Sequence, residues 1–176
     1  MSEQNILYFS RRQLLLGAGS IGLLTSTYSI YQQLGSYQAV KLGLRSLSDK
    51  ETAIYRYIGA WMLPNSEYLP GNGGDDETIR RIDLVLADVP AGKRWLFSAL
   101  VFAFEHGTAI DNFGSKALTR LPPAAGDKYL TGWAESKSLI PTQLFAALKA
   151  IYSFSYFERP DVIAAMGMKA PCEVYQ

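Results

Sequence analysis

The chain of 176 residues is poor in the side chains that most often carry chemistry, with one cysteine and one histidine. The single cysteine, Cys172, excludes a disulfide within the chain and every Cys-x-x-Cys motif for metal or haem. The single histidine, His106, excludes a metal site of the two-histidine, one-carboxylate type. The sequence also has no P-loop. We therefore expect no catalytic residues, no metal and no bound cofactor in this chain.

The chain also lacks an excess of charge of either sign. Residues 1–40 hold only three charged side chains, Glu3, Arg11 and Arg12, and the remainder holds 15 basic and 15 acidic ones. Proteins that bind nucleic acid usually carry a strong basic excess. We therefore predict no nucleic-acid partner.

The most informative motif that is present is Ser10-Arg11-Arg12-Gln13-Leu14-Leu15-Leu16, after which no charged side chain occurs until Lys41. The order of Ser10, Arg11, Arg12, Leu14 and Leu15 resembles the twin-arginine (Tat) export signal, whose translocase carries proteins that are already folded. This resemblance implies a bacterial periplasmic location, associated with the inner membrane.

The export resemblance divides the chain into a signal or anchor segment, residues 1–40, and a domain, residues 41–176. The apolar stretch over 14–30 is near the shortest length that spans a bilayer. Thr27-Tyr28-Ser29 is a weak cleavage site. Cleavage of the segment and its retention as a membrane anchor therefore both stay open.

Residues 17–22 of this segment have the Gly-x-Gly-x-x-Gly spacing of a dinucleotide-binding loop. Such a loop follows a strand and needs an acidic residue about 20 positions on. The first acidic residue after it is Asp49, which is too far along the chain. We interpret the glycines as part of the export segment.

Helical spacing and helix-ending residues recur through residues 41–176, and no run alternates as a strand would. The sequence therefore predicts an all-α, compact bundle of about five to six helices behind the N-terminal signal or anchor helix. Their expected positions are a helix from the capping box Ser48-x-x-Glu51 to Pro64, one from Asp75 or Asp76 to Pro90, one over about 93–109, one after Pro122-Pro123, one from Pro141, and a short one from Arg159 to Gly167.

Apolar residues at spacings of three and four mark the expected buried faces of these helices. In the third helix, residues 95–104 are apolar all round except Ser98, which predicts the central, buried helix of the bundle. The other faces comprise Ile54, Tyr57, Ile58, Trp61 and Met62; Ile79, Ile82, Val85, Leu86 and Val89; Tyr129, Leu130 and Trp133; and Leu144, Leu148, Ile151 and Ser155.

The remaining polar groups have structural interpretations. The adjacent carboxylates at 75–77 are expected to cap a helix. His106 is expected to cap or pack near the end of the third helix, and Glu158-Arg159 to form a surface or interface pair.

Four segments together resemble one protein family. They are the arginine pair at 10–12, Ala60-Trp61-Met62-Leu63-Pro64 before a Pro/Gly-rich loop, Ile82-Asp83-Leu84-Val85-Leu86, and the ending Tyr156-Phe157-Glu158-Arg159-Pro160 through Gly167. In this order they are similar to the gluconate 2-dehydrogenase subunit 3 family, the small subunits of membrane-bound FAD-dependent sugar and alcohol dehydrogenases. The resemblance covers most of residues 48–172.

The resemblance implies a non-catalytic small subunit needed for export, assembly and stability of a catalytic partner. In that family FAD lies in a large subunit of the glucose-methanol-choline (GMC) type, which lacks its own signal, and electrons pass to a multihaem cytochrome c. FAD and haem c are thus expected in other chains. Two alternatives stay open: a membrane-anchored periplasmic scaffold unrelated to redox chemistry, and an autonomous periplasmic enzyme with an unrecognised site.

A partner-binding subunit needs contact residues, and aromatic side chains dominate interface energetics. Cys172 has two interpretations, an inert tail residue or an intermolecular disulfide, because an exposed thiol is unstable in an oxidising compartment. The expected interface residues are Trp133, Tyr156, Phe157, Met166, Met168, Pro171, Cys172 and Tyr175.

Overall fold

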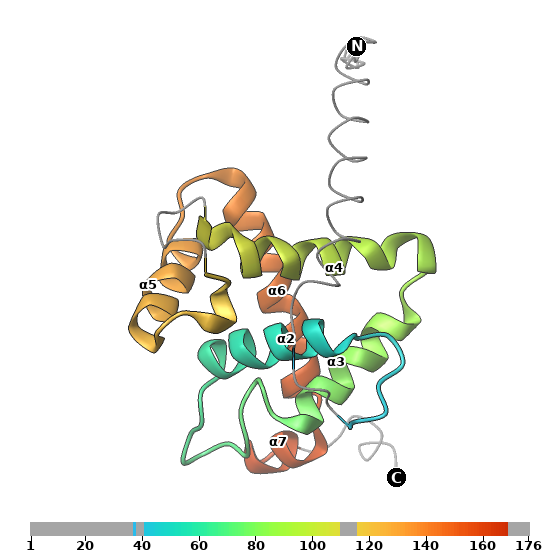
Figure 1. Cartoon of the computed structure of the whole chain (residues 1–176). Helices are drawn as coiled ribbons and strands as arrows, with labels where there is room; N and C mark the ends of the chain where they lie inside the picture. The colour runs from blue at the N-terminus through green and yellow to red at the C-terminus, as the bar shows by residue number, and fades with distance from the viewer. Residues whose placement is uncertain (1–36, 38–40, 110–115, 169–176) are drawn as a thin grey trace, which may run out of the picture. The chain divides into compact units, whose positions relative to one another are not determined.

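The structure, a computed structural model, describes residue 37 and residues 41–109 and 116–168 (Figure 1). These residues belong to one compact unit that begins at Tyr37. The export motif at 10–15, the apolar segment after it and the tail residues Pro171, Cys172 and Tyr175 lie outside the described residues.

The described part of the chain is helical and contains no strand, which confirms the all-α prediction. Six α-helices and two short 3-10 helices follow one another. They are α2 (Asp49–Met62), α3 (Asp76–Asp88), α4 (Ala91–His106), η1 (Gly107–Ala109), η2 (Leu118–Arg120), α5 (Pro123–Ala134), α6 (Leu139–Phe157) and α7 (Pro160–Ala165). Within the described ranges, none of these helices combines the length and apolarity needed to cross a bilayer.

The predicted helix starts are confirmed at both polar caps. The Glu51 amide donates to the Ser48 hydroxyl at 3.3 Å, and the Ser48 amide donates to the Glu51 carboxylate at 2.9 Å, which completes the capping box of α2. The Asp75 carboxylate accepts the Thr78 amide at 2.8 Å and caps α3. Side-chain capping thus sets where α2 and α3 begin.

The prediction that α4 is buried all round is wrong for its N-terminal half. Trp95 is 52% exposed and Leu96 49% exposed, whereas Leu100, Val101 and Phe104 are buried. The first turns of α4 project past the other helices at the right of Figure 1. The apolar composition of residues 95–104 therefore does not make α4 the central, buried helix of the bundle.

The apolar face predicted for α3 is also partly wrong. Val85 is 42% exposed, and the carboxylate of Asp83 occupies a buried position on the same helix. Of the other predicted positions, Ile79, Ile82 and Leu86 are buried as expected, and Val89 is only partly buried.

The hydrophobic core lies where α2 meets α3, α4 and α6 (Figure 1). Tyr152 of α6 is fully buried there, and its hydroxyl donates to the Tyr55 carbonyl of α2 at 2.5 Å. The largest buried core residues are Ile54, Tyr55, Ile58, Ile79, Ile82, Phe104, Leu118, Tyr129, Leu130, Leu148 and Tyr152.

The Pro/Gly-rich loop between α2 and α3 folds back onto α2. The Gly73 amide donates to the Leu63 carbonyl at 2.9 Å, and Gly59 and Gly73 are in backbone contact. A Cβ atom on either glycine would overlap the other's backbone. Glycine at 59 and 73 is therefore a packing requirement of this loop.

Candidate functional site

A fully buried carboxylate, Glu105, lies near the end of α4. It accepts the Tyr37 hydroxyl at 2.7 Å, the Thr119 hydroxyl at 2.6 Å and the Thr119 amide at 3.2 Å. These donors come from the segment before α2 and from η2. Glu105 thus ties three parts of the chain together, and its oxygens are occupied by the fold itself.

Several ionisable side chains lie near this carboxylate or near one another. Burial lowers the pKa of Lys50 to about 8, with Arg120 adding to the shift and Glu105 opposing it. Burial and the positive charges of Lys50 and Arg120 lower the pKa of His106 to about 4. Burial and the nearby Glu105 raise the pKa of Tyr37 to about 12.

The unique histidine is therefore neutral at physiological pH and packs against Phe102, with ring centroids 4.8 Å apart. Perturbed pKa values can mark an active site. Here the cations also contact aromatic rings, with the Lys50 Nζ atom 5.7 Å from the ring centroids of both Tyr37 and Phe102. We interpret the group as a packed polar cluster that serves the fold.

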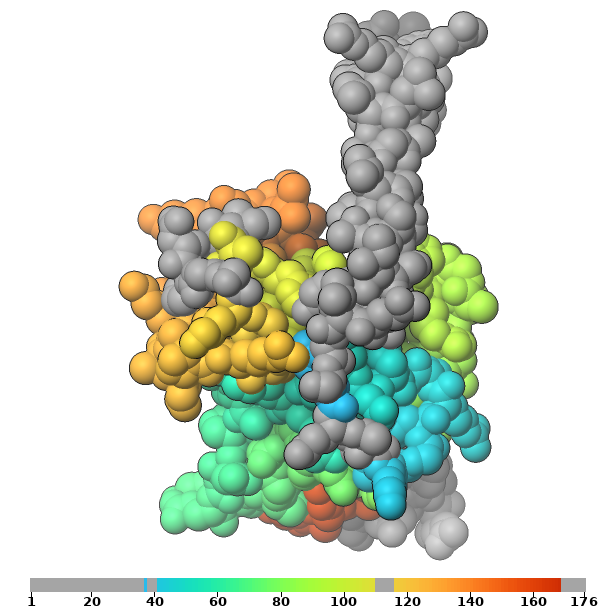
Figure 2. All heavy atoms as spheres, in the orientation of Figure 1, coloured from blue at the N-terminus to red at the C-terminus, as the bar shows by residue number. Residues whose placement is uncertain are grey.

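A second buried carboxylate, Asp83, holds the segment before α2. Its oxygens accept the backbone amides of Arg45, Ser46 and Leu47 at 2.8, 2.8 and 2.9 Å. Figure 2 shows this segment in cyan on the surface of the domain. Asp83 was missed at the sequence level because its partners lie more than 35 positions away along the chain.

The third buried polar group is Arg159, and it corrects one expectation. Arg159 is 4% exposed and pairs with Asp75 at 2.5 Å and Asp161 at 2.6 Å, so it is not a surface pair with Glu158. It also donates to the Thr78 hydroxyl at 3.0 Å. Arg159 therefore fastens the start of α7 to the start of α3.

The carboxylates at this junction have pKa values below their usual range. Burial alone would raise the pKa of Asp75, but hydrogen bonds from Thr78, Arg159 and Asn72 outweigh it. The hydrogen bond from Arg159 lowers the pKa of Asp161. Asp75 thus caps α3 as expected and also serves a buried ion pair.

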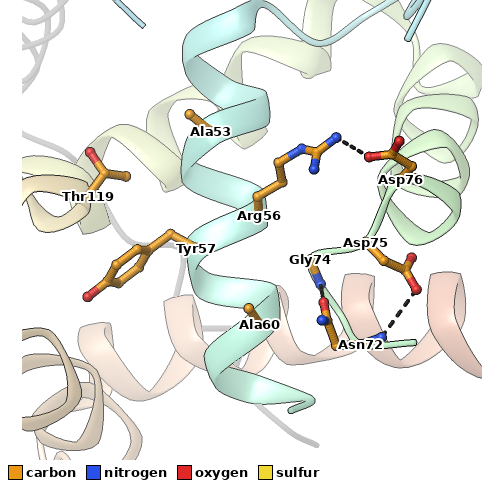
Figure 3. A pocket seen from close by; sticks show the side chains of 9 residues that line it. All are labelled: Ala53, Arg56, Tyr57, Ala60, Asn72, Gly74, Asp75, Asp76 and Thr119. Atoms are coloured by element: carbon orange, nitrogen blue, oxygen red, sulfur yellow. Dashed lines mark hydrogen bonds and ion pairs between the residues drawn. The ribbon is translucent and has the colours of Figure 1, made fainter. Parts of the chain in front are cut away.

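An open groove of about 750 Å³ runs between α2, the start of α3 and η2 (Figure 3). Arg56 of α2 and Asp76 of α3 form an ion pair across it, and the Tyr57 ring lies farther along α2. The other lining residues are Ala53, Ala60, Asn72, Gly74, Asp75 and Thr119. The charged groups of the groove all have ion-pair partners, because Arg56 pairs with Asp76 and Asp75 pairs with Arg159.

Among the residues that the structure describes, no three His, Cys, Asp or Glu side chains are grouped to hold a metal ion. The buried polar groups instead join segments of the fold.

Ten large apolar side chains are exposed among the residues that the structure describes. The most exposed are Tyr68 at 77%, Leu139 at 71% and Ile140 at 69%. The others are Leu84, Val85, Trp95, Leu96, Phe154, Phe157 and Met168. Single exposed apolar residues need no explanation, but a contiguous set marks an interaction site.

Four of these residues, Leu139, Ile140, Phe154 and Phe157, lie on the one helix α6. The sequence pattern singled out only the opposite, buried stripe of this helix. The missed signal was that α6 is apolar around most of its circumference, which is typical of a helix covered on both sides.

The interface residues expected from the sequence differ in their exposure in the structure. Tyr156 is 2% exposed, and its hydroxyl donates to the Pro70 carbonyl at 3.2 Å. Trp133 is partly buried against Phe104, with ring centroids 4.3 Å apart. Phe157 and Met168 are 38% and 54% exposed, and Met166 is partly exposed. Only Phe157 belongs to the apolar set on α6.

No protein-family model, no curated protein and no solved structure matches this chain.

Proposed function

We propose that this chain is the non-catalytic small subunit of a heteromeric FAD-dependent sugar or alcohol dehydrogenase. It carries the twin-arginine signal for the complex, and its domain binds and stabilises the catalytic flavoprotein subunit during assembly and export. The FAD belongs to that GMC-type partner, and haem c belongs to a cytochrome subunit. The assembled complex lies in the periplasm at the inner membrane.

The observation that carries this proposal is the contrast between interior and surface in the described domain. Glu105, Asp83 and Arg159 are buried and bonded to distant parts of the same chain. Large apolar side chains, by contrast, are exposed on α6. A domain built in this way is suited to bind another protein.

The N-terminal motif supports the same proposal. A signal of the twin-arginine type serves proteins that fold before export, often with a cofactor bound. In this chain we find no cofactor motif, so the folded cargo is best explained as a second chain that this domain carries. The four segments similar to the subunit 3 family support a flavoprotein as that cargo.

The proposal is tested by purifying the affinity-tagged full chain from its native membranes and periplasm. We expect a larger protein with the absorbance of oxidised flavin to co-purify in a fixed ratio. A colourless partner would instead support the scaffold alternative. Turnover or a bound chromophore in the isolated chain would support the autonomous-enzyme alternative.

A further inference from the structure

The outward face of α6 is uncharged and mostly apolar. At 100° per residue, positions 139, 143, 146, 150, 154 and 157 share one side of the helix, opposite Leu148, Ile151 and Tyr152 of the core. Every one of these outward positions is exposed, and Gln143 is the single polar residue among them. We call the set Leu139, Ile140, Ala146, Ala147, Ala150, Phe154 and Phe157 the α6 face.

Charge is almost absent from this helix. Lys149 is the one charged residue among the 19 residues of α6, and it lies at the edge of the α6 face. The exposed sides of the neighbouring helices differ: Asp127 and Lys128 are exposed on α5, and Glu77 and Arg80 on α3. The lack of charge is therefore a property of α6 and not of the whole surface.

Large and small side chains are distributed unevenly along the α6 face. Its large side chains lie at its two ends, Leu139 and Ile140 at one and Phe154 and Phe157 at the other. Exposed alanines at 146, 147 and 150 occupy the middle, next to the exposed polar side chain of Gln143. Small residues in the centre let another helix approach closely and cross there, while the large side chains pack along its flanks.

The size of the α6 face fits the centre of a protein interface. From their exposed fractions, the four large residues present on the order of 400 Å² of apolar surface. A stable interface of ordinary size buries about 800 Å² on each partner, with an apolar centre and a polar rim. The α6 face thus supplies the centre, and residues such as Thr142 and Lys149 supply part of the rim.

We infer that the α6 face is the docking surface for an apolar, uncharged helix of the flavoprotein subunit, which crosses α6 at its central alanines. This inference rests on the proposed function for the identity of the partner. An acidic or basic partner surface would gain nothing from a face without charge, and burying its charges there would be costly.

The inference is tested with two single substitutions in the full chain, Ala150→Glu and Phe154→Glu. Each substitution places a carboxylate on an exposed position of α6, so the variants should fold like the wild-type chain. Helix content and melting temperature check this. Inside an apolar interface the unpaired charge strongly opposes binding. We expect the flavoprotein that co-purifies with the tagged chain to fall at least tenfold in both variants.

Leu84→Glu is the matched control, because Leu84 is a 50% exposed apolar residue on a different helix, α3. It should leave co-purification within twofold of the wild-type chain, and Ala150→Ser should do the same. Wild-type recovery of the flavoprotein with both charged α6 variants would overturn the inference while leaving the proposed function intact.

Two other outcomes are informative. If Ala150→Glu abolishes self-association of the chain and leaves the flavoprotein bound, a second copy occupies the α6 face and the inference is wrong. If the wild-type chain binds no flavoprotein at all, the proposed function fails, and with it this choice of partner.

Discussion

At the residue scale, the domain depends on a few buried polar groups whose partners are far away in sequence. Asp83, Glu105 and Arg159 each join segments that lie far apart in the sequence. Burying such groups costs free energy unless all their hydrogen bonds are made. Removing one partner therefore destabilises the fold.

Asp83→Ala should lower the free energy of unfolding by about 3 kcal/mol, because three backbone amides lose their acceptor together. Equilibrium unfolding in urea measures this directly. Asp88→Ala is the control: Asp88 lies on the exposed side of the same helix, and its removal should change stability by less than about 0.5 kcal/mol. Equal effects of the two substitutions would contradict the role given to Asp83.

His106 should make stability fall on acidification well before the carboxylates titrate. Its pKa of about 4 in the folded chain lies below the value of about 6.5 expected when unfolded. Between these values the unfolded chain binds the proton and the folded chain does not, so the free energy of unfolding falls as pH decreases. Because the ring is only half-buried, we expect a loss of about 1–2 kcal/mol.

Unfolding in urea at several pH values between neutrality and about pH 4 measures this slope. His106→Gln removes the only histidine and should flatten it. Both proteins should still lose stability below about pH 4, where the lowered pKa values of Asp75 and Asp161 in the folded chain come into play. A wild-type chain of constant stability from neutrality down to about pH 4 would contradict the environment described for His106.

At the scale of the elements, helix α2 and its following loop are locked by the contact between Gly59 and Gly73. Alanine in place of glycine within a helix normally stabilises a protein by up to about 1 kcal/mol. A Cβ atom at Gly59 would instead overlap the Gly73 carbonyl and the ring of Tyr152.

Gly59→Ala should therefore lower the free energy of unfolding by about 2 kcal/mol. Gly132→Ala on α5 is the matched comparison, because a Cβ atom there meets open space, and it should raise stability by several tenths of a kcal/mol. Thermal or urea unfolding of the two variants gives the sign of each change. A stabilising Gly59→Ala would show that the loop does not rest on α2.

The elements also show what sequence could and could not predict. Helix starts at Ser48 and Asp75 follow from local capping, so they were predictable from a few neighbouring residues. The exposure of Trp95 and Val85 was not, because it depends on which helices lie alongside them. The buried carboxylates were missed for the same reason: their partners are brought near only by the tertiary fold.

The candidate binding surface could be predicted only in part. Phe157 was expected at an interface because aromatic side chains dominate interface energetics, and it lies on the α6 face. Tyr156, its neighbour, points into the protein because successive helix positions differ by 100°. The composition of α6 indicates that two sides of the helix are suited to burial. It does not indicate which side packs against the core.

At the scale of the whole molecule, the proposed function combines an N-terminal export signal with a domain that binds another protein. In the proposed function, the arginine pair at 11–12 belongs to the export signal, and residues 41–176 form the domain that binds the flavoprotein subunit. Each part explains the other, since a signal for folded cargo is useful on this chain when the cargo stays bound during transport.

The most direct test replaces both arginines, Arg11→Lys together with Arg12→Lys, and follows two proteins by cell fractionation and immunoblotting. The predicted result is that this chain and the flavoprotein subunit both remain in the cytoplasm, while an unrelated exported protein reaches the periplasm as usual. Export of the flavoprotein at its normal level in this variant would contradict the central claim.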